Sequence, residues 1–171
     1  MKKKLFCLIL ILILIFCFTG CSKTTYEDFI YGFEEYLQES FPEDDISIKC
    51  EEEDFWIYFG SEKAPIMLTL LFDGESILED DERMNEEAKS IHLTGSFLEY
   101  DSAQSAKIFG GFLDYLSKDI DNAMDGAKEV SNMIEEYSTY QKAERKVDRG
   151  QVDFLPLDLD NAIISIVFSS N

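Results

Sequence analysis

Histidine and cysteine, the side chains most used in metal sites and nucleophilic catalysis, are scarce in this sequence. It contains a single histidine, His92, and only one cysteine beyond residue 21, Cys50. One cysteine cannot form an intramolecular disulfide or a cysteine-based zinc site. A catalytic serine or cysteine needs a base nearby, and His92 lies between Ile91 and Leu93, which indicates a histidine that packs. We therefore expect no metal site and no cofactor.

The short motifs that mark common enzyme classes are also missing. There is no glycine-rich phosphate loop, no dinucleotide-binding fingerprint and no metalloprotease helix with paired histidines. The sequence therefore predicts a protein that is not an enzyme. A hydrolase that works with two carboxylates needs only a suitable separation of two acids. With 35 acidic residues in the chain, that class stays open as the third alternative.

Runs of acidic residues are common in calcium-binding loops, so we compared the spacing of the acids with the spacing that such a loop requires. The twelve-residue calcium loop has acids at positions 1, 3 and 5, glycine at 6 and glutamate at 12. A loop starting at Asp119 places Ala123 at position 5 and Met124 at position 6. The acidic turn at Asp158 and Asp160 has no later carboxylate to complete a coordination shell. Neither segment fits the loop, and only loose cation binding at the surface stays open.

Basic residues are outnumbered more than two to one. The chain has 15 lysines and arginines against 35 acids, and its formal net charge is −20 at pH 7. Nucleic-acid binding needs cations that displace counterions from phosphates, so no nucleic-acid partner is expected. Basic proteins, cations and neutral ligands are compatible with such a surface.

One long hydrophobic run lies at the N-terminus. Lysines at positions 2–4 precede the 14-residue run Leu5–Phe18, which is shorter than the roughly 20 residues that span a bilayer as a helix. This layout is typical of a secretory signal. The segment that follows, Phe18-Thr19-Gly20-Cys21, resembles the lipobox of bacterial lipoproteins, in which an aliphatic residue, a small residue and Gly or Ala precede the cysteine.

The resemblance implies that Cys21 is lipidated and becomes the mature N-terminus after cleavage. Residues 1–20 would be the signal peptide, 21–24 a very short tether, and 25–171 a single acidic domain. We expect this domain to be lipid-anchored on the extracytoplasmic face of a bacterial cell membrane, with a signal resembling those of Gram-positive species. Removing the first 20 residues takes away three lysines and no acid, so 12 basic and 35 acidic residues leave a formal charge of −23.

The periodicity of apolar residues predicts an α+β fold. Helical spacing marks 25–40, 77–91, 101–116 and 120–146, and strand-like runs lie at 46–50, 55–59, 66–72, 152–155 and 162–168. Because residues 66–72 are apolar on both faces, we expect that strand in the centre of the sheet and covered by helices. The expected architecture is one domain with an antiparallel sheet of about five strands covered by about four helices.

Two local features refine this prediction. Thr24 or Thr25 can cap the first helix, with Glu27 or Asp28 completing a capping box. The pair Gly110-Gly111 lies within an expected helix, where each glycine costs roughly 1 kcal/mol relative to alanine. We interpret this pair as a point where a neighbouring element approaches closely.

Four basic residues break the acidic pattern near the end of the expected helix 120–146. Lys142, Arg145, Lys146 and Arg149 follow the spacing i, i+3, i+4 and i+7, so a helix would place them on one stripe. This stripe predicts a docking site for an acidic partner or for lipid phosphates. The alternative is that these cations stabilise the C-terminal end of a helix.

The favoured function is a lipid-anchored, non-catalytic interaction module that uses an acidic face to hold a protein or ligand outside the membrane. One variant is an immunity-like role towards a basic secreted protein. The second hypothesis is a lipoprotein that binds a small ligand or a divalent cation between sheet and helices. In that case Trp56, Tyr58 and Phe59 would offer stacking surface, although such aromatics commonly belong to the core.

Overall fold

The computed structural model describes residues 24–52, 54–97, 102–138, 143–158 and 163–170. These residues form an α+β fold with three α-helices and an eight-stranded antiparallel sheet. In chain order the elements are α2 (Tyr26–Ser40), β1 (Ile46–Glu51), β2 (Asp54–Phe59), β3 (Glu62–Phe72), β4 (Glu75–Ser76), the 3-10 turn η1 (Glu82–Asn85), β5 (Ser90–Ser96), α3 (Ser102–Leu116), α4 (Ala123–Ser138), β6 (Glu144–Val147), β7 (Gly150–Asp158) and β8 (Ile163–Ser170).

The C-terminal strand joins the two halves of the chain in one sheet. The strand order is β1-β2-β3-β5-β8-β7-β6, with β4 pairing with β3 beside this path. Strand β8 therefore lies between β5 and β7, and it pairs with β5 from Ser90 opposite Ser169 to Ser96 opposite Ile163. Consequently the first strands of the chain and the last two hairpin strands share a single core.

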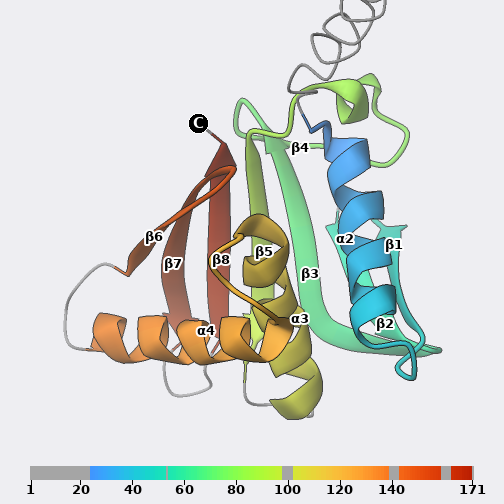
Figure 1. Cartoon of the computed structure of the whole chain (residues 1–171). Helices are drawn as coiled ribbons and strands as arrows, with labels where there is room; N and C mark the ends of the chain where they lie inside the picture. Colours follow the sequence, from blue (N-terminus) through green and yellow to red (C-terminus); the bar gives the residue numbers. More distant parts are fainter. Residues whose placement is uncertain (1–23, 53, 98–101, 139–142, 159–162, 171) are drawn as a thin grey trace, which may run out of the picture.

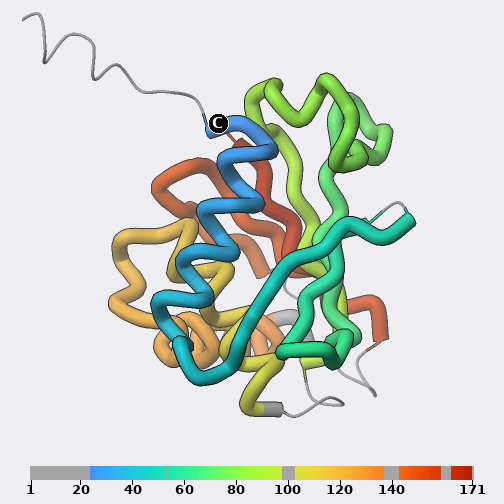
Figure 2. The backbone as a smooth tube through the Cα atoms, turned by 90° about the vertical axis from the view of Figure 1, so that its right-hand side faces the viewer, coloured from blue at the N-terminus to red at the C-terminus, as the bar shows by residue number. Residues whose placement is uncertain are grey.

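All three helices lie on the same side of the sheet (Figure 1, Figure 2). Strand residues on that side are fully buried, as Ile57, Leu68 and Ile166 show. The Phe29 ring of α2 stacks on Phe168 of β8 with the two centroids 6.1 Å apart. Burial of these large apolar side chains, each worth roughly 1.5–3 kcal/mol, fixes the helices on this face.

The opposite side of the sheet, here named the open face, has no α-helix over it in the described part of the chain. Cross-strand pairing places six half-buried side chains at its centre: Trp56, Met67, Thr69, His92, Thr94 and Val167. The expectation that the third strand is covered by helices therefore holds for only one face of β3. Leu68 is buried beneath the helices, whereas Met67 and Thr69 contact solvent.

Helix α2 begins at the capping box that the sequence predicts. The Thr25 hydroxyl accepts a hydrogen bond from the backbone N–H of Asp28 at 3.0 Å, and the Asp28 carboxylate accepts one from the backbone N–H of Thr25 at 3.3 Å. These reciprocal bonds satisfy donors that a helix N-terminus otherwise leaves unpaired.

The same helix covers the free edge of β1. The Glu34 carboxylate accepts a hydrogen bond from the backbone N–H of Ile48 at 3.1 Å, and the Gln38 amide donates to the carbonyl oxygen of Ile46 at 2.9 Å. An edge strand otherwise offers such groups to strands of other molecules. Two α2 side chains therefore protect the β1 edge.

The interpretation of the glycine pair in α3 is confirmed. A Cβ atom on Gly110 would overlap the carbonyl oxygen of Ala123 and lie 2.5 Å from the backbone nitrogen of Ala127. From the other side, a Cβ on Gly126 of α4 would lie 2.8 Å from the carbonyl carbon of Gly110. Helices α3 and α4 therefore cross with their backbones in contact, which only residues without side chains allow.

The predicted helix 77–91 is wrong. Ile77 follows the short strand β4, Met84 lies in η1, and Ile91 lies in β5. All three are buried, so the apolar positions were identified correctly. Their apparent helical spacing arises because the residue after β4, the turn η1 and the strand β5 all contribute to the core.

The predicted helix 120–146 is correct for Ala123–Ser138 and wrong for Glu144–Lys146. Helix α4 ends at Ser138, and Glu144–Val147 forms the edge strand β6. Together with β4 and β5, this strand raises the sheet to eight strands and lowers the α-helix count to three in the described residues, against the five and four expected. Asp101, the first residue of the predicted helix 101–116, lies outside those residues.

Candidate functional site

The three described residues of the predicted docking stripe, Arg145, Lys146 and Arg149, do not share a helical face. Arg145 and Lys146 are neighbours on β6, Arg149 lies in the turn between β6 and β7, and Lys142 is outside the described residues. Successive residues of a strand point to opposite faces. The single stripe on which the prediction depended is therefore absent among Arg145, Lys146 and Arg149.

Arg145 has a structural partner instead. Its Nε donates to Glu129, and its Nη2 donates to Glu136 at 2.8 Å, both in α4. These hydrogen bonds lower the pKa of the Glu136 carboxyl and raise the pKa of the Arg145 guanidinium. One cation shared by two carboxylates ties the edge strand β6 to the helix beside it.

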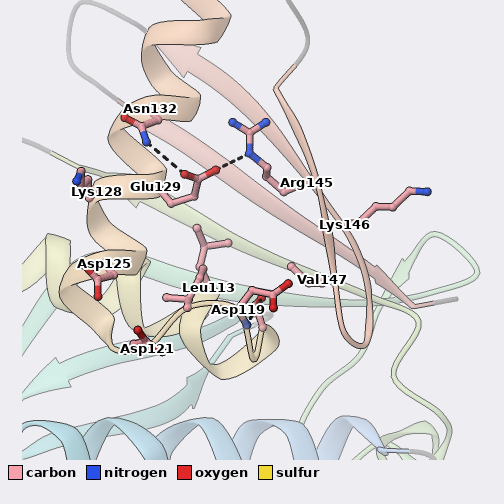
Figure 3. A pocket seen from close by; sticks show the side chains of 12 residues that line it. Leu113, Asp119, Asp121, Asp125, Lys128, Glu129, Asn132, Arg145, Lys146 and Val147 are labelled. Carbon is pink, nitrogen blue, oxygen red and sulfur yellow. Dashed lines mark hydrogen bonds and ion pairs between the residues drawn. The ribbon is translucent and has the colours of Figure 1, made fainter.

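A cleft of about 490 Å³ lies between α4, the connection from α3 to α4, and β6 (Figure 3). We name it the α4–β6 cleft. Leu113, Ile120 and Val147 supply its apolar surface. Its charged lining residues are Asp119, Asp121, Asp125, Lys128, Glu129, Arg145 and Lys146. The volume is within the range of roughly 300–1,000 Å³ that is usual for small-ligand pockets.

Three of these seven charged side chains, Asp125, Glu129 and Arg145, are held by neighbouring residues. Figure 3 shows Arg145 directed toward Glu129, whereas Lys146 extends from β6 the opposite way. Asp125 accepts a hydrogen bond from the Asn122 amide at 2.8 Å, which belongs to the N-terminal cap of α4. The cleft therefore uses much of its charge to hold its own walls together.

Arg149 stabilises another part of the fold. Its guanidinium carbon lies 4.6 Å from the centroid of the Tyr115 ring, which is within reach of a cation–π interaction. Tyr115 in turn packs edge-on against Phe29 at 5.3 Å. The turn between β6 and β7 is thereby linked to the aromatic core under α2.

The aromatic residues considered for stacking lie on different faces of β2. Phe59 is opposite Ile46 on the helix side, whereas Trp56 and Tyr58 belong to the open face. Lys63 Nζ lies 3.7 Å from the Trp56 ring centroid, and Lys49 Nζ lies 4.4 Å from that of Tyr58. Lysine side chains therefore occupy the ring faces that a ligand would stack on, and no pocket between sheet and helices contains all three aromatics.

His92 lies at the centre of the open face, opposite Thr69 on one side and Val167 on the other. It is half-buried, and burial lowers its pKa below the usual 6.5. A neutral imidazole among strand side chains agrees with the packing role that the sequence indicates.

The solvent side of α2 carries negative charge and an exposed aromatic ring. Glu27, Tyr31, Glu35 and Glu39 follow one another at intervals of four and are all exposed, so they form one stripe, here named the α2 acidic face. Tyr31 is 56% exposed at its centre. The helix contains no lysine or arginine, although a cation near its C-terminal end would be stabilising.

A second concave surface lies where the C-terminal end of α2 meets the N-terminal end of α4. This α2–α4 groove has a volume of about 360 Å³ and is lined by Tyr36, Ser40, Phe41, Asp114, Asp121, Asn122, Ala123 and Met124. Met124 is 61% exposed. The lining contains two carboxylates and no lysine or arginine. Sequence reasoning missed this groove because its walls come from three separate segments.

The described residues lack both a metal-binding cluster and a membrane-spanning helix. They contain no group of three or more His, Cys, Asp or Glu side chains placed to hold a metal ion. They also contain no helix that is both long and apolar enough to cross a bilayer. The predicted lipidation residue, Cys21, lies outside the described residues. Comparison with protein-family models, curated proteins and solved structures finds no match.

Proposed function

We propose that this chain is a bacterial lipoprotein, anchored through Cys21, whose domain acts as a non-catalytic interaction module for a basic protein. The observation that carries this proposal is the α2 acidic face. Five acids and no base lie in the 15 residues of α2, which is the first element after the proposed anchor. Like charges four residues apart, as at Glu35 and Glu39, destabilise a helix.

An arrangement that works against helix stability is best explained by a use for it at the surface. An exposed tyrosine in a stripe of carboxylates can supply contact area, while the carboxylates accelerate encounter with a positively charged partner. The short chain between Cys21 and Tyr26 keeps this face near the membrane. An immunity-like lipoprotein that captures a basic secreted protein is the variant that matches this position and charge.

The experiment is cross-linking and recovery of the tagged, lipidated protein from its own cells. We expect one basic protein in near-equal amount, and we expect it to be lost when Glu35→Lys and Glu39→Lys are combined. The control combines Glu79→Lys with Asp80→Lys, two exposed acids in the connection between β4 and η1 and outside α2, which change the net charge equally. Equal loss in both variants, or no partner, would contradict the proposal.

Anchoring is tested separately. Incorporation of a palmitate analogue should disappear on changing Cys21→Ala, and the protein should leave the membrane fraction. Retention in the membrane by the alanine variant would show an uncleaved apolar segment instead of a lipid.

The α4–β6 cleft supports a second candidate function, small-ligand binding. The favouring observation is an apolar floor with both signs of charge around a volume of about 490 Å³. A melting-temperature screen of the purified protein with wall fragments, amino acids and calcium tests it. A compound that raises the melting temperature of the protein should no longer do so in the Lys128→Glu variant. Lys128 lines the cleft, is exposed and forms no ion pair within the described residues, so its charge is available to a ligand.

A further inference from the structure

The α2–α4 groove combines an exposed apolar surface with carboxylates, and its lining contains no lysine or arginine. Its apolar surface comes from Tyr36, Phe41 and Met124, and its acids are Asp114 and Asp121. The α4–β6 cleft, by contrast, contains Arg145 and two lysines beside its acids. In the groove no basic side chain opposes the carboxylates, so a cation arriving from outside meets uncompensated negative charge.

The two acids are held differently. Asp114 accepts a hydrogen bond from the Tyr36 hydroxyl. Burial and this bond raise the pKa of Tyr36 to about 12, so the phenol stays protonated and keeps Asp114 in place. Asp121 is exposed in the connection between α3 and α4, and its carboxylate accepts no hydrogen bond within the described residues. One acid is preorganised and the other is available.

Met124 is the apolar contact of the groove. It is 61% exposed at the start of α4, although an exposed methionine gains nothing for the folded monomer. Unbranched and polarizable, methionine adapts to partners of different shape and is common on peptide-binding surfaces. Phe41, in the groove wall, is partly covered by Lys107 at 5.1 Å, but that lysine is already paired with Asp44.

We propose that the α2–α4 groove binds a basic, amphipathic segment of a protein partner. An apolar side chain of that segment contacts Met124 and Phe41, and an adjacent lysine or arginine is placed between Asp114 and Asp121. This inference rests on the proposed function and names the part of the partner that it recognises. The charge complementarity of an acidic groove on a strongly acidic chain selects a basic segment over an acidic or neutral one.

The experiment measures binding of defined peptides to the full chain held in nanodiscs of neutral phosphatidylcholine, with empty nanodiscs as the blank. One fluorescent peptide has lysines on both sides of a central Leu-Phe pair. The matched peptide has two serines in place of this pair and the same charge. We expect the Leu-Phe peptide to bind about tenfold more tightly, which is the size of effect that burying one large apolar side chain gives. Equal affinity of the two peptides would overturn the proposal.

Variants separate docking from general electrostatic attraction. Met124→Glu adds a negative charge, so a purely electrostatic interaction would strengthen or stay unchanged, whereas docking in the groove predicts a loss of about tenfold for the Leu-Phe peptide. Leu157→Glu is the matched control, because Leu157 is also 61% exposed and the substitution adds the same charge. If the two variants behave alike, the groove is not the site. Asp121→Lys should weaken the binding of both peptides more than Asp80→Lys does.

Two further outcomes are decisive. Recovery of a partner from cells could depend on Glu35 and Glu39 but not on Met124. That outcome would overturn the groove as the binding site and leave the proposed function standing. Self-association of the full chain that Met124→Glu abolishes would assign the groove to a second copy of the protein and overturn the basic segment as its occupant.

Discussion

Gly110 and Gly126 set the distance between α3 and α4. Changing Gly110→Ala removes the helix-propensity cost of glycine, about 1 kcal/mol, but it drives a methyl group into the backbone of Ala123 and Ala127. Backbone atoms cannot rotate away as a side chain can, so the crossing must open. We expect a net loss of about 2 kcal/mol or more in the free energy of unfolding, measured by urea denaturation.

The neighbouring glycine provides the matched control. A Cβ on Gly111 would lie 2.9 Å from Cδ2 of Leu37, which is the end of a flexible side chain. The propensity gain and a small shift of Leu37 nearly cancel, so Gly111→Ala should change stability by less than about 1 kcal/mol. Equal effects of the two substitutions would mean that the helix crossing does not depend on Gly110.

His92 gives the fold a pH dependence of known sign. Burial lowers the pKa of His92 in the folded protein below its ordinary 6.5, so as the pH falls through 6.5 the unfolded chain takes up the proton first. Because the unfolded state then binds more protons, the free energy of unfolding decreases as the pH falls through this window. His92→Gln should reduce the stability difference between pH 7.5 and pH 5.5, measured by urea denaturation at both values. An unchanged difference would show that carboxyl groups alone carry it.

The α2 helix limits strand pairing by β1 as well as contributing to the core. Replacing Glu34 and Gln38 together by alanine frees the backbone groups of Ile46 and Ile48 at the sheet edge. Free edges invite pairing between molecules, so we expect faster self-association, followed by light scattering and thioflavin fluorescence. The control replaces Glu35 and Glu39 by alanine, which removes two acids from the same helix without touching β1. Self-association in both double variants would indicate a charge effect instead.

Which elements the sequence could predict depended on how many core residues each supplies. Helix α2 repeats its apolar spacing over 15 residues and has a capping box, so its position was clear. Strand β5 supplies only Ile91 and Leu93 to the core. The predicted helix 77–91 included Ile91 as its last apolar position, so the strand was missed. The alternation of polar and apolar residues from Ser90 to Thr94 was the signal that could have identified this strand.

Strand β6 was harder to predict, for a physical reason. Only Val147 of its four residues is apolar, because an edge strand faces solvent and is specified by backbone pairing with β7 and by the bond of Arg145 to Glu129. Backbone pairs and ion pairs of this kind leave no apolar periodicity in the sequence of the strand. The basic spacing from Lys142 to Arg149 therefore imitated a helix.

The candidate surfaces were predictable in part. The excess of acids was plain from composition, and the α2 acidic face follows once the helix is known. The α2–α4 groove could not be foreseen, because it depends on the helix crossing at Gly110 and Gly126, which brings Met124 beside Tyr36 and Phe41. Geometry of that kind arises only from the packing of separate elements.

Charge repulsion acts on the molecule as a whole. With 35 acids and 15 bases, and with Lys63, Arg83, Lys107 and Arg145 already engaged in ion pairs, most negative charge is opposed only by solvent ions. Compact folding brings these charges together, so screening should stabilise the folded state. Raising sodium chloride from 0.01 to 0.5 M shortens the Debye length from about 30 Å to below 10 Å, and we expect the melting temperature to rise throughout this range.

The choice of cation distinguishes screening from specific binding. Calcium and magnesium chloride at the same ionic strength should raise the melting temperature to similar extents, because the described residues contain no cluster placed to hold a metal ion and a diffuse ion atmosphere depends mainly on valence. A calcium effect well above that of magnesium would identify a site with the larger coordination number that calcium prefers. That result would favour a cation-dependent binder over a protein-binding module. Equal increases in melting temperature with the two salts would leave the acidic face free for a basic protein at physiological salt.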